Sequence, residues 1–346
     1  MTMLKKQLFI LLSLMLTSIA GAQDYYTTID ILRPGRVTFP KEAQHVLVVN
    51  NAVNQPHDYA HQSRLMGQIT SNVTIDTDSA LLYFLTAFSQ TLEDQEFFGS
   101  VDLLETTQNT SERYFEQHSM TGLQIDHLRK MYDADAIITL NRLLLSDMLE
   151  DYLTTDEDYY AYLEVHCVSI WHIYMPGQER PTAITLSDTL LWENRDYRRS
   201  DAIDALPNRR DALLDMAIYS AQSIGRRLVP HWEQRDRYFY YHSDKQMQAG
   251  MDSLYHKKWE GAIGEWYSAY ERGNTKLKAC AAANMASAFE IEGDLRSAYF
   301  WAQRAAEHFG DGLLTNNKQQ QEANMRAYAN ELQMRIKEED LLQLQY

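Results

Sequence analysis

Cysteine and positive charge are both scarce in this sequence of 346 residues. The two cysteines, Cys167 and Cys280, fall on the apolar face of a predicted strand and on an alanine-rich predicted helix. Such thiols are typical of small buried side chains, and two of them form neither a disulfide framework nor a zinc site. The 32 lysines and arginines oppose 48 aspartates and glutamates, which gives a net charge of −16. This imbalance disfavours nucleic acid and anionic membranes as partners.

The motifs of common catalytic sites are also missing. The sequence has no glycine-rich phosphate loop, no G-x-S-x-G nucleophile elbow and no cysteine–histidine dyad. We therefore expect a protein that is not an enzyme, with no catalytic residue, no cofactor and no metal ligand.

The segment His57-Asp58-Tyr59-Ala60-His61 comes nearest to a metal site. Two histidines four residues apart share one face of a helix and could bind zinc with a third ligand. Pro56 precedes them, however, and the glutamate of an H-E-x-x-H motif is missing. The pattern therefore predicts a polar loop over residues 50–78.

Three further polar groups each have a structural interpretation. Asp133 and Asp135 could hold a cation or act as acid and base, but aspartate is also common in turns such as the one they flank. His166 and His172 lie on one face of a predicted strand roughly 20 Å apart, too far to share a metal ion. The acidic run over residues 147–158 lacks the glycine and spacing of a calcium loop, and we expect a solvated loop there.

No apolar run follows the first 22 residues as a stop-transfer segment. Those 22 residues have a positive start at Lys5 and Lys6, an apolar middle, and Ala20-Gly21-Ala22 as an A-x-A cleavage site. This pattern predicts a secretory signal peptide, and the apolar middle is too short for a comfortable membrane span. No cysteine lies near the cleavage point for a lipid anchor, so we expect an exported, periplasmic protein that begins near Gln23.

Residues 23–242 carry the pattern of an α/β or α+β domain with a mixed sheet. The continuous apolar run over residues 45–49 suits a central strand covered on both faces. A helix over 124–132 leads directly into a strand at 136–140, which is the order of a βαβ unit. Two long alternating segments then predict a β-hairpin. A long amphipathic helix over 209–228 closes the domain before Pro230.

Residues 243–346 predict a domain made of helices alone. Ala262 and Ala269 recur as Ala298 and Ala305, a repeat of about 36 residues. Small residues at these places let antiparallel helices approach closely. A long helix over 317–344 is expected to cap the repeats.

Residues 244–310 resemble two tetratricopeptide repeats, with Gly293-Asp294 at the turn of the second copy. The first copy lacks that turn glycine. The resemblance implies a concave surface that binds a protein or peptide. Four aromatic residues are candidate partner-binding anchors: Trp259, Trp266, Tyr270 and Trp301.

The strand HVLVVNN, a predicted helix over residues 79–93 and the segment DHLRKMYDADAIITLNRL come before the long hairpin. With these elements, residues 45–192 resemble the fold shared by the TolB amino-terminal domain and the curli-secretion lipoprotein. The whole order of segments also resembles an uncharacterised family of exported proteins and lipoproteins of Gram-negative bacteria. None of these resemblances transfers a catalytic residue.

Three hypotheses of function follow. The first is an exported binding or scaffold module of the bacterial cell envelope, with a protein or peptide partner on the helical repeats. The second is a periplasmic hydrolase, perhaps metal-dependent, that uses the 50–78 loop after the first central strand. The third is an assembly factor for an envelope secretion complex.

Overall fold

The computed structural model describes residues 25–111, 113–116, 119–311 and 316–345. The predicted signal peptide, residues 1–22, lies outside these ranges. The chain divides into two compact units, and each is treated by itself. The sheet unit comprises Pro34–His231 and the residues from Leu344 on, and the helical unit comprises the chain up to Arg33 and Trp232–Gln343. Within the described residues, the helices are too short or too polar to span a membrane.

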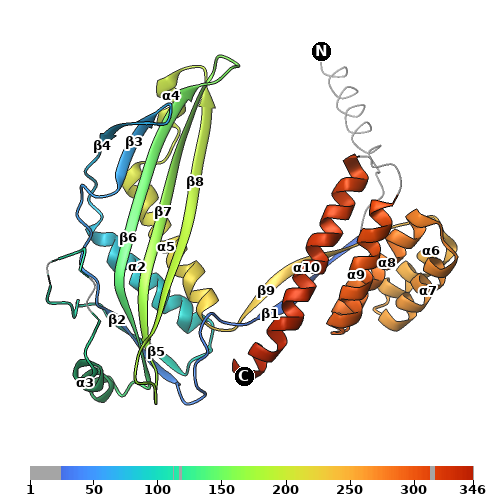
Figure 1. Cartoon of the computed structure of the whole chain (residues 1–346), viewed down its shortest axis with the longest axis horizontal. Helices are drawn as coiled ribbons and strands as arrows, with labels where there is room; N and C mark the ends of the chain where they lie inside the picture. The colour runs from blue at the N-terminus through green and yellow to red at the C-terminus, as the bar shows by residue number, and fades with distance from the viewer. Residues whose placement is uncertain (1–24, 112, 117–118, 312–315, 346) are drawn as a thin grey trace, which may run out of the picture. The chain divides into compact units, whose positions relative to one another are not determined.

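The sheet unit contains a mixed sheet of seven strands with helices packed against it (Figure 1). Its strands are β2 His45–Asn50, β3 His61–Leu65, β4 Gln68–Asn72, β5 Ser100–Leu104, β6 Ala136–Leu153, β7 Tyr159–Tyr174 and β8 Thr182–Asp196. Its helices are α2 Asp78–Asp94, α3 Gly122–Tyr132, α4 Arg199–Asp204 and α5 Arg209–Leu228. The order β4-β3-β6-β2-β5 forms one path, while β7 pairs with β6 and β8. Strand β2 runs parallel to both β5 and β6, as the predicted βαβ order requires.

Strand β2 lies between β5 and β6 in the sheet, and its side chains are buried on both faces. Val46 and Val48 pack into the core that α2 and α5 cover. Leu47 and Val49 pack into a second core on the face of α3. The continuous apolar run in the sequence therefore reflects a strand with no solvent-facing side, as predicted.

Strand β6 is much longer than predicted, so the solvated loop expected at the acidic run is wrong in its first part. Asp147, Glu150 and Asp151 lie in β6, are buried, and face residues of β7 along a continuous antiparallel ladder. Each carboxylate has a nearby donor: Asp147 has Arg209, Glu150 has the Tyr162 hydroxyl, and Asp151 has Arg199. Pairing with partners distant in sequence removes the reason to expect solvent exposure.

The predicted 50–78 loop is also only partly correct. It contains a short hairpin, β3 and β4, which turns at Met66 and Gly67, both with positive φ. Strand β3 adds to the sheet in parallel with β6, with His61 opposite Asp147. The two strands are largely polar, so their sequences do not alternate between apolar and polar residues as half-buried strands do.

The helical unit consists of stacked helices, as predicted, together with a two-stranded sheet. The helices are α6 Lys245–Tyr255, α7 Trp259–Arg272, α8 Thr275–Ile291, α9 Leu295–Gly310 and α10 Asn316–Gln345. The strands are β1 Tyr25–Arg33 and β9 His231–Phe239. Contacts join α6 to α7, α7 to α8 and α8 to α9, which is the succession of antiparallel hairpins that the repeat predicts. The mixed-sheet and stacked-helix fold class is thus confirmed.

The core of the helical unit includes one residue from β9. Phe239 is fully buried, and its ring stacks on Trp259 and Trp266 with centroids 6.2 and 5.7 Å away. Tyr25 of β1 packs against the same ring and against Tyr255 of α6. The strand end is therefore part of the packing of the helices.

Candidate functional site

The helical unit holds an extended segment of its own chain by the main chain. Asn284 of α8 is fully buried, and its side-chain oxygen accepts a hydrogen bond of 2.6 Å from the Tyr240 amide. Its side-chain nitrogen donates to the Tyr240 carbonyl at 3.0 Å. One asparagine therefore satisfies both main-chain groups of a residue 44 positions away.

Two further residues on α8 extend this contact. The Ser287 hydroxyl lies 3.5 Å from the Tyr238 carbonyl. Glu290 accepts two hydrogen bonds from the Arg237 guanidinium, at 2.5 and 2.9 Å. Positions 284, 287 and 290 share one helix face because they are three residues apart. We call residues 236–240 the self-bound segment.

Glu290 forms the deepest part of this contact. Its carboxylate is fully buried and also accepts hydrogen bonds from the Tyr328 hydroxyl and from Arg335, both on α10. Arg237 donates in addition to Glu331 at 2.8 Å. Two arginines and two glutamates thus balance in charge inside the unit, as buried ions require.

Burial and the nearby carboxylate act together on Tyr328. Burial, and then the charge of Glu290, raise the pKa of the Tyr328 hydroxyl well above its ordinary value. The phenol therefore stays protonated and keeps donating to Glu290. Burial lowers the pKa of Arg237, but its hydrogen bonds and the charge of Glu290 outweigh this effect and raise it.

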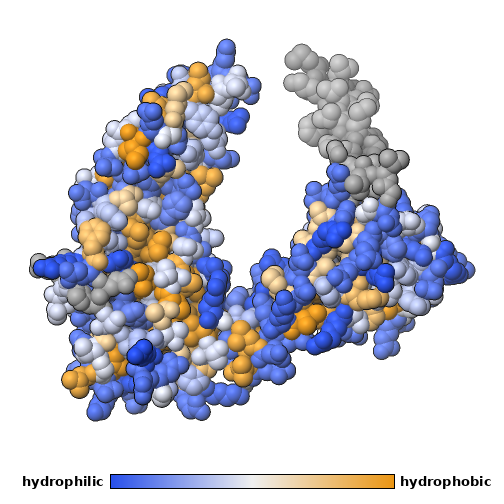
Figure 2. All heavy atoms as spheres, in the orientation of Figure 1, coloured by the Kyte–Doolittle hydropathy of each residue, from blue (hydrophilic) through white to orange (hydrophobic). Residues whose placement is uncertain are grey.

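A pocket of about 600 Å³ lies beside the self-bound segment. The self-bound segment and Ser287 form part of its lining, and α10 forms the rest. The α10 residues that line it are Asn317, Gln320, Gln321, Asn324, Met325, Ala327, Tyr328 and Glu331. We call this space the α10 pocket. On the face visible in Figure 2, most of the helical unit is hydrophilic. The lining of the α10 pocket combines amide and carboxylate side chains with aromatic and aliphatic ones.

The four aromatic residues predicted as anchors occupy two different environments. Trp266 is fully buried and Trp259 is packed against the same core, so both stabilise the fold of the helices. Tyr270 and Trp301 are half-buried and meet edge to face with centroids 5.0 Å apart. Trp301 also contacts the rings of two residues that are each 48% exposed, Tyr267 and Phe300.

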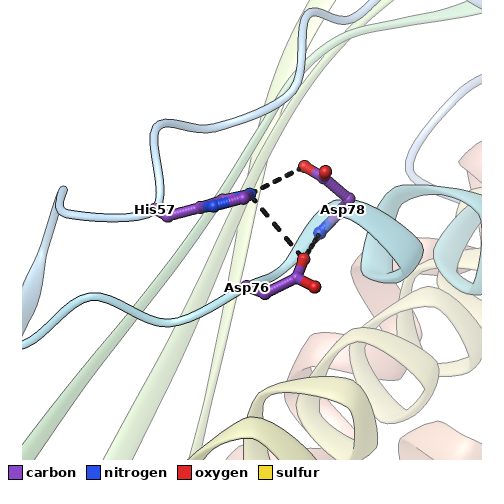
Figure 3. Close-up of side chains that lie close together, drawn as sticks. All are labelled: His57, Asp76 and Asp78. Atoms are coloured by element: carbon purple, nitrogen blue, oxygen red, sulfur yellow. Dashed lines mark hydrogen bonds and ion pairs between the residues drawn. The ribbon is translucent and has the colours of Figure 1, made fainter.

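In the sheet unit, the structure brings His57 together with two aspartates before and at the start of α2 (Figure 3). One imidazole nitrogen of His57 lies 2.9 Å from Asp78 and 3.7 Å from Asp76. The hydrogen bond to Asp78 raises the pKa of His57 above 6.5, against a smaller opposing effect of desolvation. One ligand atom from each of the three residues lies within 4.8 Å of the others, but all three side chains are substantially exposed.

His57 and His61, which the sequence placed in one candidate cluster, have separate partners. His61 lies in β3 with a fully buried side chain, and its Nδ1 is 2.6 Å from Asp147. Arg209 donates to the other oxygen of Asp147 at 2.5 Å, which completes a buried charge group. Local sequence patterns carry no signal for this group, because Asp147 lies 62 residues from Arg209 and 86 residues from His61 along the chain.

Three other polar candidates make contacts within a turn or the sheet. Asp133 ends α3 in the left-handed conformation, and its carbonyl contacts the His45 ring at 2.9 Å. Asp135 accepts hydrogen bonds from the main-chain amides of Gln44 and His45. His166 contacts Thr189 across the β7–β8 pair. These contacts fit the turn and strand interpretations of the sequence.

Another pocket, of about 360 Å³ and with a polar lining, lies beyond the carboxyl ends of β2 and β5, where open α/β sheets commonly bind ligands. Its described lining includes Asn51, Gln108, Asn109, Arg113 and Glu116. The lining mixes amides and one charge of each sign, and it indicates no particular reaction.

Together, these features define a protein that joins a mixed-sheet unit to a unit of stacked helices. The chain belongs to the family described as domain of unknown function DUF8603, whose model matches residues 43–240. Residues 248–334 match a second model, domain of unknown function DUF6340. No curated protein matches the chain.

The boundaries of these matches separate the two sides of the main-chain contact. Tyr240 is the last residue of the first match, and Asn284 lies within the second. Sequence reasoning did not identify Asn284. The signal that could have found it is the tripeptide Ala-Asn-Met, which occurs at 283–285 and again at 323–325.

Proposed function

We propose that this chain is a non-catalytic binding protein of the bacterial cell envelope whose helical unit takes an extended segment of a protein partner. The contact between Asn284 and the main chain of Tyr240 carries this proposal. The helices already hold an extended segment through its amide and carbonyl, and these groups are the same in every peptide. The α10 pocket leaves room beside that segment for another chain.

Two sequence features support the finer parts of the proposal. The signal-peptide pattern of residues 1–22 supports export to the periplasm. The resemblance of residues 244–310 to tetratricopeptide repeats supports a protein or peptide as the ligand. In the structure, the charges of Arg237 and Arg335 are balanced by those of Glu290 and Glu331. This balance supports a structural role for the four side chains and gives no argument for catalysis.

Site-specific photo-crosslinking in the envelope of the host tests this proposal. A photoreactive residue at Gln321, in the α10 pocket, should capture a discrete partner. The same residue at Lys276, which is exposed on α8 outside the pocket, serves as the control. Equal capture at both positions, or no capture at Gln321, would contradict the proposal.

A second candidate is a cation-dependent activity of the sheet unit, as in the hydrolase hypothesis. The close approach of His57, Asp76 and Asp78 favours it, since imidazole and carboxylate groups are zinc ligands. Calorimetric titration with Zn²⁺ should then show one site that is lost in His57→Ala and kept in His166→Ala. Absence of heat above that of the His57→Ala variant would remove this candidate.

A further inference from the structure

The helical unit contains two copies of the tripeptide Ala-Asn-Met, one in α8 and one in α10. Met285 of the first copy is fully buried in the core of the unit. Met325 of the second copy packs against the same core and against the neighbouring one. Since successive helical residues are turned by a fixed angle, each asparagine has the same position relative to its core-facing methionine.

The two asparagines differ in what lies against them. Asn284 is buried beneath the self-bound segment and holds the main chain of Tyr240. Asn324 is exposed, lines the α10 pocket, and accepts a hydrogen bond of 2.9 Å from Gln320 one helical turn earlier. Its side chain therefore faces space of the size that ligand pockets have.

We propose that Asn324 is a second main-chain clamp, which holds an extended peptide segment of a partner protein in the α10 pocket. This inference rests on the proposed function and names the residue and the ligand class. The side-chain oxygen of Asn324 accepts from a peptide amide and its nitrogen donates to the carbonyl of the same residue. The self-bound segment on Asn284 is the internal precedent for this geometry.

The remaining lining indicates which peptide fits. Tyr238, Tyr240 and Met325 offer apolar and aromatic surface to its side chains. The described lining carries the carboxylates of Asp236 and Glu331, and its one arginine, Arg237, is already paired with Glu290 and Glu331. A neutral or basic peptide with an aromatic or aliphatic residue is therefore favoured over an acidic peptide or a free anion.

Selection of phage-displayed random heptapeptides on the full mature chain tests the clamp. Selected peptides are then synthesised and titrated by calorimetry into the wild type and three variants. Asn324→Ala and Asn324→Asp should each weaken binding about tenfold or more, because the first removes both hydrogen-bonding groups and the second removes the donor. Asn330→Ala, which alters an exposed asparagine of α10 outside the pocket, should leave affinity unchanged.

Several outcomes separate the clamp from the broader function. Peptides that bind wild type and Asn324→Ala equally would overturn the clamp, while crosslinking at Gln321 would still support the proposed function. Failure to select any peptide, together with no crosslink at Gln321, would overturn both. Self-association of the chain that Asn324→Ala abolishes would assign the pocket to a second copy and overturn the partner assignment. Because Asn324 is exposed, equal melting temperatures of the variants provide the check on folding.

Discussion

At the scale of single residues, the buried carboxylate of Glu290 links three parts of the helical unit. Its partners come from β9 and α10, whereas Glu290 itself lies in α8. Buried ions are tolerated where each has its counter-charge and hydrogen bonds, and removal of one partner leaves the others unpaired. A change of charge at Glu290 should therefore disturb all three elements.

Replacement of Glu290 by glutamine should strongly destabilise the helical unit. It leaves the guanidinium groups of Arg237 and Arg335 without their shared buried counter-ion, and we expect the free energy of unfolding to fall by about 3–5 kcal/mol. Glu331→Gln is the matched control, because this side chain is 23% exposed and its pairing should contribute about 1 kcal/mol or less. Urea denaturation followed by tryptophan fluorescence measures both. Equal losses in the two variants would contradict the account.

A second residue-scale prediction concerns the protonation of His57. Its pKa in the folded protein lies above 6.5 because of the hydrogen bond to Asp78, with added attraction from Asp76. Since the folded pKa is the higher one, this pair stabilises the fold below pH 6.5, and the effect is lost as pH rises through the folded pKa.

An NMR titration of the His57 ring measures this shift directly. Asp78→Asn should bring the pKa of His57 down towards 6.5, because it removes the hydrogen-bonded charge. Asp58→Asn should change it much less, since Asp58 makes the smallest contribution. A His57 pKa at or below 6.5 in the wild type would rule out the ion pair in solution.

At the scale of secondary-structure elements, the close packing of α6 on α7 depends on a glycine. A Cβ atom at Gly250 would lie 2.2 Å from the indole nitrogen of Trp266. Trp266 is fully buried and stacks on Phe239, so it has little room to move. A residue without a side chain is needed at this position because the backbone of one helix packs directly on the indole ring of the next.

Two glycine-to-alanine substitutions in neighbouring helices should have opposite effects. Gly250→Ala should lower the free energy of unfolding by about 1–3 kcal/mol, because the clash exceeds the gain in helix propensity. Gly264→Ala, where a Cβ meets no described atom within 4 Å, should raise it by about 0.5–1 kcal/mol. Thermal and urea unfolding of both variants measure the sign. Destabilisation of similar size in both would show that packing on Trp266 is not the cause.

At the scale of the whole molecule, sequence order does not decide which compact unit a segment joins. Strand β1 precedes the entire sheet unit in the chain, yet it pairs with β9 and belongs to the helical unit. Tyr25 packs on Phe239 and Tyr255, while the neighbouring Tyr26 is 58% exposed. The helical unit is therefore assembled from segments at both ends of the described chain.

Hydrogen exchange can detect this long-range assembly. Tyr25→Ala should increase amide exchange in β9 and α6, because it removes the ring that packs between Phe239 and Tyr255. Protection in β2, β6 and β7 of the sheet unit should remain unchanged. Tyr26→Ala is the control and should have a smaller effect in β9. Faster exchange throughout both units would contradict the assignment of β1 to the helical unit.

The local pattern of the sequence determined the elements whose burial is regular. The apolar run of β2, the stripe of α5, the alternation of β7 and the small residues of the helical repeats were all predicted, and all are present. Each of these patterns depends only on residues that are close together in the sequence. A strand or helix that buries one face, or both, must repeat apolar residues at its own period.

Tertiary structure alone decided the remaining features. Asp147, Glu150 and Asp151 read as solvated, but arginine and tyrosine side chains from other elements make their burial in β6 favourable. The polar strands β3 and β4 are stabilised by pairing with each other, and β3 also pairs with β6. Asn284 is one polar residue in an alanine-rich helix until Tyr240 lies against it. In each case the stabilising partner is distant along the chain, and a local pattern carries no information about which distant groups will meet.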